Sequence, residues 1–383
     1  MHRLCTIIAL NYLPQAIALV ESTREIYPDI EFYVLITDAT QREHPNLSYA
    51  QILLPEDLHI PKDWLSEMRS YYDTVEFATS LKPFLLSTLL VDKVSTVTFL
   101  DPDILLFSEL RDGFEGAENS GIALTPTRLT PSDINTTGFS ELSFLQYGIF
   151  NLGYIAVGHK GKPMLKWWGE RLRWYATRYP LDHVFTDQKW MNFVPALFPC
   201  QILRNPGYNL TQWNINERPL NRVGKEIYAG NSPLVFIHFS QMSGILAVGK
   251  KTKYWENALD DSPESVNSLT IISKFTDEYS ARLVALKKII STDINTRASK
   301  SNVHLIGFHR RQKMISASIK ASRSGVENRS AKGTSPFLRR RSSRSVRFLE
   351  RSSIFNGLLW GWSVDFPKVV SKFRKLIISR PRN

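Results

Sequence analysis

Two aspartates separated by one proline follow an apolar run of strand length. The run Val97 to Leu100 leads directly into Asp101, Pro102 and Asp103. In extended backbone, side chains two residues apart point to the same side, and proline fixes the φ angle between them. Paired carboxylates suit Mg²⁺ or Mn²⁺, which prefer oxygen ligands and can neutralise a diphosphate. We predict a metal site here, with an exposed turn carrying two solvated carboxylates as the alternative.

A histidine ends a second apolar run. His238 follows Leu234 to Ile237. Neutral imidazole can ligate Mn²⁺, and the end of a parallel strand would lie on the same rim of the sheet as Asp101. We therefore predict His238 as the third metal ligand, with a structural histidine at a strand end as the alternative.

Short apolar runs alternate with longer helical patterns over residues 1–240. This alternation is typical of an α/β domain whose mostly parallel sheet carries helices on both faces, and ligands bind such sheets beyond the carboxyl ends of the strands. The predicted strands are Thr6 to Leu10, Glu31 to Thr37, Ala50 to Leu54, Thr96 to Leu100, Ile122 to Thr125, Leu152 to Val157 and Leu234 to His238. The predicted helices are Val75 to Leu90, Met164 to Tyr179, Asp187 to Leu197 and Ser265 to Ile290.

Composition indicates a globular protein. The chain has 383 residues, 43% of them hydrophobic, which is enough for a substantial core. Its two cysteines, Cys5 and Cys200, do not form a disulfide framework and argue for a reducing compartment, so we expect a cytoplasmic protein. We assign the apolar run Leu4 to Leu10 to a strand; a signal peptide is the alternative.

Positive charge is concentrated in the last part of the chain. Residues 296–383 hold 21 Lys and Arg residues against three acids, a net charge of +18, so residues 1–295 carry −6 of the overall +12. An acidic folded part argues against nucleic acid as a partner. We predict a catalytic domain over 1–292, a flexible basic Ser/Arg-rich segment over 293–353 and an apolar and basic amphipathic segment over 354–383.

The final segment has the pattern of an interfacial helix. Apolar residues on one helical face alternate with basic residues, and two tryptophans precede them, as in helices that lie on anionic membranes. The apolar residues are Phe366, Val369, Val370, Phe373, Leu376 and Ile377, and the tryptophans are Trp360 and Trp362. We predict peripheral attachment to the inner face of the plasma membrane; packing of this helix on the catalytic domain is the alternative.

Ordered motifs over about residues 5–240 resemble those of bacterial glycosyltransferases of the GT-A (Rossmann-like) nucleotide-diphospho-sugar superfamily. A more distant similarity is to family 8, the glycogenin and galactosyltransferase group. The matching segments are Ala9-Leu10-Asn11-Tyr12, Leu81-Lys82-Pro83, Phe99-Leu100-Asp101-Pro102-Asp103, Phe150-Asn151-Leu152-Gly153, Thr186-Asp187-Gln188, Asn205-Pro206-Gly207-Tyr208-Asn209 and Ile237-His238-Phe239. The resemblance departs from family 8 after His238, where a Gly and a Lys-Pro-Trp segment are missing.

The resemblance implies roles for individual residues. Donor binding falls to Ala9, Asn11, Tyr12, Asp38, Lys82 and Asp101, of which Lys82 approaches the donor phosphate or sugar. The metal ligands are Asp101, Asp103 and His238. The residues at the sugar and its reacting carbon are Asn151, Asp187 and Gln188. A surface position for Lys82 and a helix-terminal role for Asp187 are the structural alternatives.

The resemblance also implies an activity. It predicts a hexosyltransferase that uses Mn²⁺ or Mg²⁺, retains anomeric configuration, and moves a sugar from a UDP-sugar to a glycan or lipid-linked acceptor, as in cell-envelope polysaccharide synthesis. One rival is a sugar nucleotidyltransferase, which usually needs a Gly-rich loop that Ala9 to Ala16 lacks. The other is a nucleic-acid-binding protein that uses the Arg-rich tail.

Overall fold

The computed structural model describes residues 1–39, 47–132, 140–178, 184–242, 251–256, 258–260 and 262–294. All of them belong to one unit of the chain, which spans Met1–Phe308. The predicted segments over 293–353 and 354–383 lie almost entirely outside the described residues, so the domain boundaries and the tail stay predictions.

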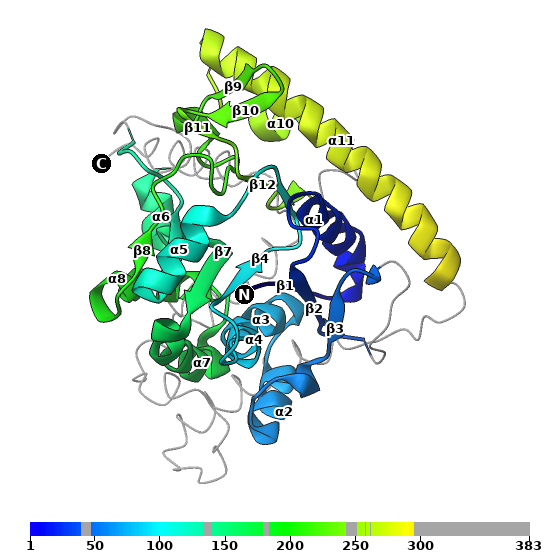
Figure 1. The fold of residues 1–383 in the computed structure, drawn as a ribbon, viewed down its shortest axis with the longest axis vertical. Helices are drawn as coiled ribbons and strands as arrows, with labels where there is room; N and C mark the ends of the chain where they lie inside the picture. Colours follow the sequence, from blue (N-terminus) through cyan, green and yellow to red (C-terminus); the bar gives the residue numbers. More distant parts are fainter. Residues whose placement is uncertain are drawn as a thin grey trace, which may run out of the picture. The chain divides into compact units, whose positions relative to one another are not determined.

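A mixed sheet forms the centre of the described part. Its strands are β1 (His2–Ile8), β2 (Glu31–Ile36), β3 (Gln51–Leu53), β4 (Thr96–Leu100), β6 (Ile122–Pro126), β7 (Phe150–Gly158) and β8 (Gln201–Ile202). Among the described residues they form one seven-stranded sheet in the order β3-β2-β1-β4-β7-β6-β8 (Figure 1). All are parallel except β7, which is antiparallel to both β4 and β6. The predicted mostly parallel sheet is confirmed.

Helices cover both faces of the sheet because its strands are apolar on both sides. Along β1, Leu4 and Ile8 join one core cluster, whereas Cys5 and Ile7 join the other, as the two-residue repeat of a strand requires. The first cluster includes residues of α1 (Leu13–Ile26), α5 (Arg111–Ser120) and α11 (Pro263–Ile294). The second includes residues of α2 (Lys62–Tyr71), α3 (Thr74–Ser80), α4 (Lys82–Leu89), α7 (Lys162–Tyr175) and α8 (Val194–Leu197). The predicted α/β fold class, with helices on both faces of a mostly parallel sheet, is confirmed.

Two predicted helices have different forms in the structure. The predicted helix Val75 to Leu90 is broken at Leu81 into α3 and α4, because Pro83 has no N–H to continue the hydrogen bonds of α3. The predicted helix Asp187 to Leu197 is a 3₁₀-helix, η6 (Gln188–Phe193), followed by the short α8. Both breaks matter for the site, since they set the positions of Lys82 and Asp187.

The remaining elements are short. They are the 3₁₀-helices η1 (Leu10–Tyr12), η3 (Pro55–Asp57), η4 (His159–Gly161) and η7 (Ile215–Glu217), the helices α6 (Glu141–Tyr147) and α10 (Lys251–Glu256), and the strands β5 (Ile104–Leu106), β9 (Leu220–Val223), β10 (Glu226–Ala229), β11 (Ser232–Pro233) and β12 (Phe236–His238). Strands β9 to β11 form an antiparallel sheet, and β5 pairs antiparallel with β12. The run that ends in His238 is therefore not a strand of the central sheet, which corrects the prediction.

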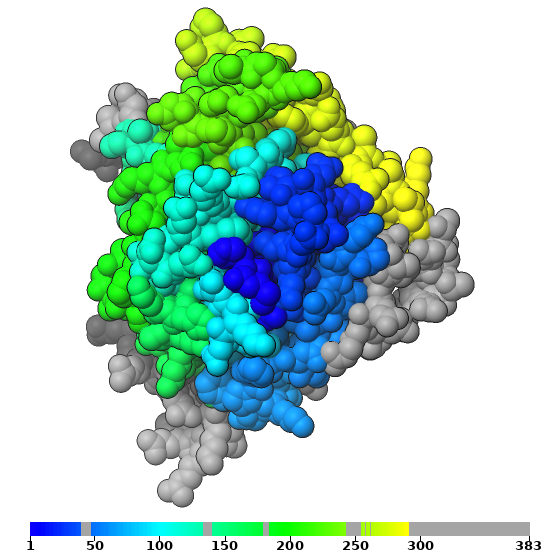
Figure 2. Space-filling model, in the orientation of Figure 1, coloured from blue at the N-terminus to red at the C-terminus, as the bar shows by residue number. Residues whose placement is uncertain are grey.

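The long helix α11 packs along α1 (Figures 1 and 2). Arg282 of α11 donates a hydrogen bond to Glu21 of α1, and Ile272, Leu283 and Leu286 belong to the core cluster that α1 shares. None of the described helices combines the length and the apolar character needed to cross a membrane.

Candidate active site

Asp101 and Asp103 lie in the turn between β4 and β5. The backbone N–H of Asp101 donates to the carbonyl of Gly153 in the neighbouring β7, 2.8 Å away, and the N–H of Ile104 donates to the carbonyl of Asp101. The two side chains are 30% and 15% exposed. The carboxylates therefore lie where the sequence predicts them, at the carboxyl end of a central strand, and are neither fully buried nor freely solvated.

His238 reaches these aspartates through the pairing of β12 with β5. The register places His238 opposite Ile104, and the N–H of Phe239 donates to the carbonyl of Asp103 at 2.9 Å. The predicted neighbourhood of His238 and the aspartates is confirmed, but its predicted cause is wrong. An antiparallel partner of the strand that directly follows Asp103 brings the imidazole in, not the end of a parallel strand.

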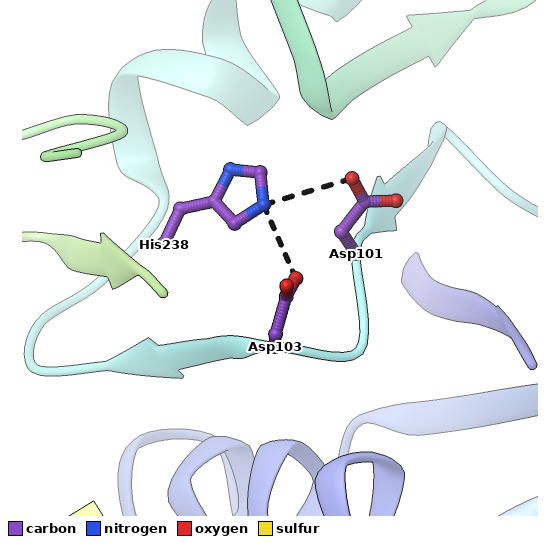
Figure 3. A group of neighbouring side chains, drawn as sticks. All are labelled: Asp101, Asp103 and His238. Carbon is purple, nitrogen blue, oxygen red and sulfur yellow. Dashed lines mark ion pairs between the residues drawn. The ribbon is translucent and has the colours of Figure 1, made fainter. Parts of the chain in front are cut away.

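The three side chains face one another (Figure 3). The His238 Nε2 atom lies 3.1 Å from a carboxylate oxygen of Asp103 and 3.7 Å from one of Asp101. One ligand atom from each residue lies within 4.8 Å of the others, so these three residues, called the metal group below, could hold a metal ion. Two carboxylates and one imidazole form a donor set that suits Mn²⁺ or Mg²⁺.

Burial and neighbouring charges shift the pKa values of two members of this group. Burial by itself lowers the pKa of His238, but Asp103 and Asp101 outweigh burial, and the pKa is raised overall. Burial raises the pKa of Asp101 against the lowering effects of Lys82 and His238. The raised pKa of Asp101 thus comes mainly from burial, whereas that of His238 comes from the two aspartates.

Lys82 links the metal group to the predicted reaction centre. Its Nζ atom lies 2.7 Å from Asp187 Oδ2, 3.4 Å from Asp101 Oδ1, and donates to the carbonyl of Leu152 at 2.9 Å. The side chain is only 4% exposed, which excludes the surface alternative. Burial works to lower the pKa of Lys82, but Asp101 and Asp187 raise it above its ordinary value, so the ammonium stays charged.

The other predicted reaction-centre residues hold the backbone of β7. Asn151 Oδ1 accepts from the N–H of Gly153 at 2.9 Å. Gln188 Oε1 accepts from the N–H of Leu152, and its amide nitrogen donates to the carbonyl of Tyr147. Asn151, Gln188 and Lys82 thus all bond the same stretch of β7, at Leu152 and Gly153. The roles of Asn151 and Gln188 at the sugar stay predictions.

The predicted donor-binding residues follow β1 and β2. The N–H of Leu10 donates to the Asp38 carboxylate at 2.8 Å, and the N–H of Tyr12 donates to the carbonyl of Ala9. Because β2, β1 and β4 are parallel neighbours, these loops share the sheet edge at which Asp101 lies. Asn11 is exposed there.

Three residues at the site have no role in the sequence-based prediction. Gly153 leaves room for the imidazole, since a Cβ atom there would lie 2.3 Å from His238 Cε1. Asn209 Oδ1 lies 3.2 Å from His238 Nδ1. Tyr279 of α11 is buried, and its raised pKa, caused mainly by burial, also reflects Asp103 and Tyr12. The segments that contain Gly153 and Asn209 match the glycosyltransferase motifs, and that match was the available signal.

Two Bacillus subtilis (strain 168) proteins, both called uncharacterised, are similar to this chain in sequence. YfnF is 25% identical over 310 residues, which cover 78% of this chain and 98% of YfnF. YfnD is 21% identical over 249 residues, which cover 61% of this chain and 76% of YfnD. No family model matches the chain.

The chain also has a distant similarity to solved glycosyltransferase structures. The galactosyltransferase LgtC, in complex with donor and acceptor sugar analogues, is 12% identical with a TM-score of 0.41, over 73% of this chain and 95% of that chain. Mouse xyloside xylosyltransferase 1 is 10% identical with a TM-score of 0.36, over 63% and 98%. GlyE of Streptococcus pneumoniae TIGR4 is 17% identical with a TM-score of 0.38, over 72% and 65%.

Proposed function

We propose that this chain is a metal-dependent glycosyltransferase that takes a sugar from a nucleotide-diphosphate donor. The observation that carries the proposal is the group Asp101, Asp103 and His238, with ligand atoms within 4.8 Å of one another beside the carboxyl end of β4. The loops after β1 and β2 lie along the same edge of the sheet, where nucleotides bind in folds of this kind.

The reaction breaks the bond between the anomeric carbon and the diphosphate oxygen and forms a bond to an acceptor oxygen, whose proton passes to the released diphosphate or to water. When bound, Mn²⁺ or Mg²⁺ supplies positive charge to the departing diphosphate. Asp101, Asp103 and His238 would hold the ion. Ala9, Asn11, Tyr12 and Asp38 would contact the nucleoside.

Lys82 would position two carboxylates of the reaction centre. Its ammonium lies within 3.4 Å of both Asp101 and Asp187, so it fixes the two carboxylates relative to one another. Asp187 would face the reacting carbon together with Asn151 and Gln188. Buried, fixed charges stabilise developing charge better than mobile ones, because little reorganisation is needed during the reaction.

The finer parts of the proposal come from the motif resemblance. We propose a UDP-sugar donor, retention of anomeric configuration, and a glycan or lipid-linked acceptor in cell-envelope polysaccharide synthesis. The cytoplasm is the proposed compartment, and the basic C-terminal segment would attach the enzyme to the inner face of the plasma membrane.

The experiment is a donor screen with the full chain. UDP-, GDP- and ADP-sugars are incubated with Mn²⁺, and release of the nucleoside diphosphate is measured, with EDTA as the metal-free control. Parallel reactions contain UTP and a sugar 1-phosphate. The proposal expects diphosphate release from a nucleotide sugar and no pyrophosphate from UTP; the reverse result would identify a sugar nucleotidyltransferase.

A further inference from the structure

We infer that Asn209 is a positioning residue that fixes the ring orientation and the tautomer of His238, so that Nε2 faces the metal group. The inference rests on the metal site of the proposed function. Asn209 Oδ1 lies 3.2 Å from His238 Nδ1, while His238 Nε2 lies 3.1 Å from Asp103. The two ring nitrogens thus have different partners on opposite sides of the ring.

The neighbours of Asn209 decide which of its side-chain atoms faces the ring. Its amide nitrogen donates to the carbonyl of Asn151 at 3.2 Å and to the Thr125 hydroxyl oxygen at 2.8 Å. That hydroxyl itself donates to the carbonyl of Asn151. A carbonyl can only accept, so the nitrogen of Asn209 must point to Asn151 and its oxygen to His238.

The oxygen of Asn209 therefore requires a proton on His238 Nδ1. A neutral ring in that tautomer has its free electron pair on Nε2, the atom that faces Asp101 and Asp103. Nε2 can face the carboxylates as a proton donor when the ring is doubly protonated, or it can offer this electron pair to a cation held between the three residues. Hydrogen bonds of this kind on the far side of a metal-ligating histidine typically orient the ring and strengthen its bond to the metal.

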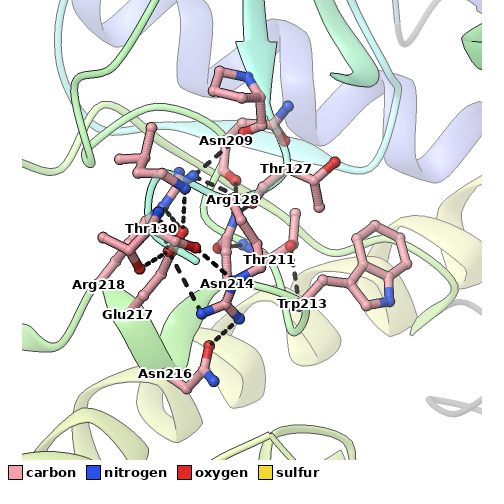
Figure 4. Close-up of polar contacts among 12 residues, drawn as sticks. Thr127, Arg128, Thr130, Asn209, Thr211, Trp213, Asn214, Asn216, Glu217 and Arg218 are labelled. Carbon is pink, nitrogen blue, oxygen red and sulfur yellow. Dashed lines mark hydrogen bonds and ion pairs between the residues drawn. The ribbon is translucent and has the colours of Figure 1, made fainter. Parts of the chain in front are cut away.

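The backbone of Asn209 is held in place before any ion binds (Figure 4). Its φ angle is 56°, in the left-handed region that Asn tolerates better than most residues. Its carbonyl accepts from the Asn214 amide at 3.0 Å, and the preceding carbonyl, of Tyr208, accepts from buried Arg218 at 2.6 Å. Leu210 next to it pairs with Ile237, directly before His238. Asn209 is thus fixed on both sides beside the histidine.

The test uses full-length protein and three variants. Asn209→Gly tolerates the left-handed backbone and removes the side chain, and with it the bonds to His238, Thr125 and Asn151. Asn209→Asp keeps an oxygen toward the ring but cannot donate to the Asn151 carbonyl, so comparison with Asn209→Gly separates the bond to His238 from the other two. Asn205→Ala is the matched control, because Asn205 lies in the same segment but bonds Asp112 instead of His238. The Mn²⁺ dissociation constant is measured by electron paramagnetic resonance without donor or acceptor.

We expect Asn209→Gly to weaken Mn²⁺ binding by about 10- to 100-fold, the range seen when such a second partner of a metal ligand is removed. Asn209→Asp and Asn205→Ala should remain within a few-fold of the wild type. An Asn209→Gly variant that folds and binds Mn²⁺ as tightly as the wild type would overturn the inference.

A second measurement is made on the metal-free wild-type protein. The ¹⁵N chemical shifts of the His238 ring report its tautomer in the metal-free wild-type protein, at a pH at which the ring is neutral, and His238→Gln identifies the signals. The inference expects a proton on Nδ1; a proton on Nε2 would contradict it. If the wild type binds no Mn²⁺ but shows the Nδ1 proton, the metal proposal fails and the positioning of His238 by Asn209 stands.

Discussion

Lys82 Nζ lies 2.7 Å from Asp187 Oδ2, and each of these side chains is only 4% exposed. Lys82 begins α4, whereas Asp187 lies directly before η6. The ion pair therefore joins two segments that pack on the sheet independently. Because Lys82 also contacts Asp101, this pair sets the distance between the metal group and the predicted reaction centre.

Removal of one partner of this ion pair should destabilise the fold. Lys82→Met leaves the buried carboxylate of Asp187 without a cation, and breaking a buried pair in this way costs about 3–5 kcal/mol of the free energy of unfolding. The double variant Lys82→Met/Asp187→Leu should recover most of that loss, because neither charge is then left alone. Urea unfolding gives the free energy of unfolding of the wild type, the single variant and the double variant.

The exposed pair Arg282 with Glu21 provides the control. These side chains are 46% and 39% exposed, so Arg282→Gln should cost less than about 1 kcal/mol. An unfolding free energy of Lys82→Met equal to that of the wild type would mean that Lys82 and Asp187 are not coupled in solution.

Gly153 should be essential for the metal site because it lies against the imidazole. Gly153→Ala would place a Cβ atom 2.3 Å from Cε1 and 2.4 Å from Nδ1 of His238, so the ring must move. We expect Mn²⁺ affinity to fall by at least about tenfold. Gly169→Ala is the control, since its Cβ would approach only the ring of Phe84, at 3.1 Å. Equal Mn²⁺ affinity of both variants and the wild type would rule out this close contact.

The C-terminal segment should bind anionic membranes. Each basic residue near an anionic surface contributes about 1 kcal/mol. The full chain should float with anionic vesicles at low salt and much less with neutral ones. Flotation should largely disappear after replacement by Gln of Lys368, Lys372, Arg374 and Lys375. The control replaces exposed lysines of the catalytic domain, Lys62, Lys93, Lys162 and Lys166. If the two fourfold variants float equally well, the segment is not the membrane anchor.

Local patterns predicted the sheet and part of the site. The strand and the two carboxylates that follow it, Asp101 and Asp103, are adjacent in the sequence. Their position at the end of a strand can therefore be predicted without knowledge of distant residues. Successive residues of β1 point to opposite faces of the sheet, and apolar residues occur at both sets of positions, so the sequence predicts that both faces are covered. The resemblance added the residues after β1 and the pair Asp187 and Gln188.

The remaining contacts depend on packing between distant segments. The sequence around Lys82 and Pro83 is compatible with a surface position. Lys82 is buried because α4, which it begins, packs on the sheet. The contact of His238 with Asp103 depends on β12 pairing with β5, and its contact with Asn209 depends on a single left-handed residue. Sequence periodicity predicts neither the strand pairing nor the left-handed residue. This explains why the position of His238 was predicted correctly for a wrong reason.

The central claim is that Asp103 helps to hold a cation needed for sugar transfer. Mn²⁺-dependent release of nucleoside diphosphate from the best donor, measured for the wild type, Asp103→Asn and the control Asp112→Asn, tests it most directly. Asp112 carries the same chemical change but bonds Asn205, outside the metal group. We predict that Asp103→Asn loses on the order of a hundredfold or more in rate, a few kcal/mol of transition-state stabilisation, with an unchanged melting temperature. Wild-type activity of Asp103→Asn with the same dependence on Mn²⁺ would contradict the account.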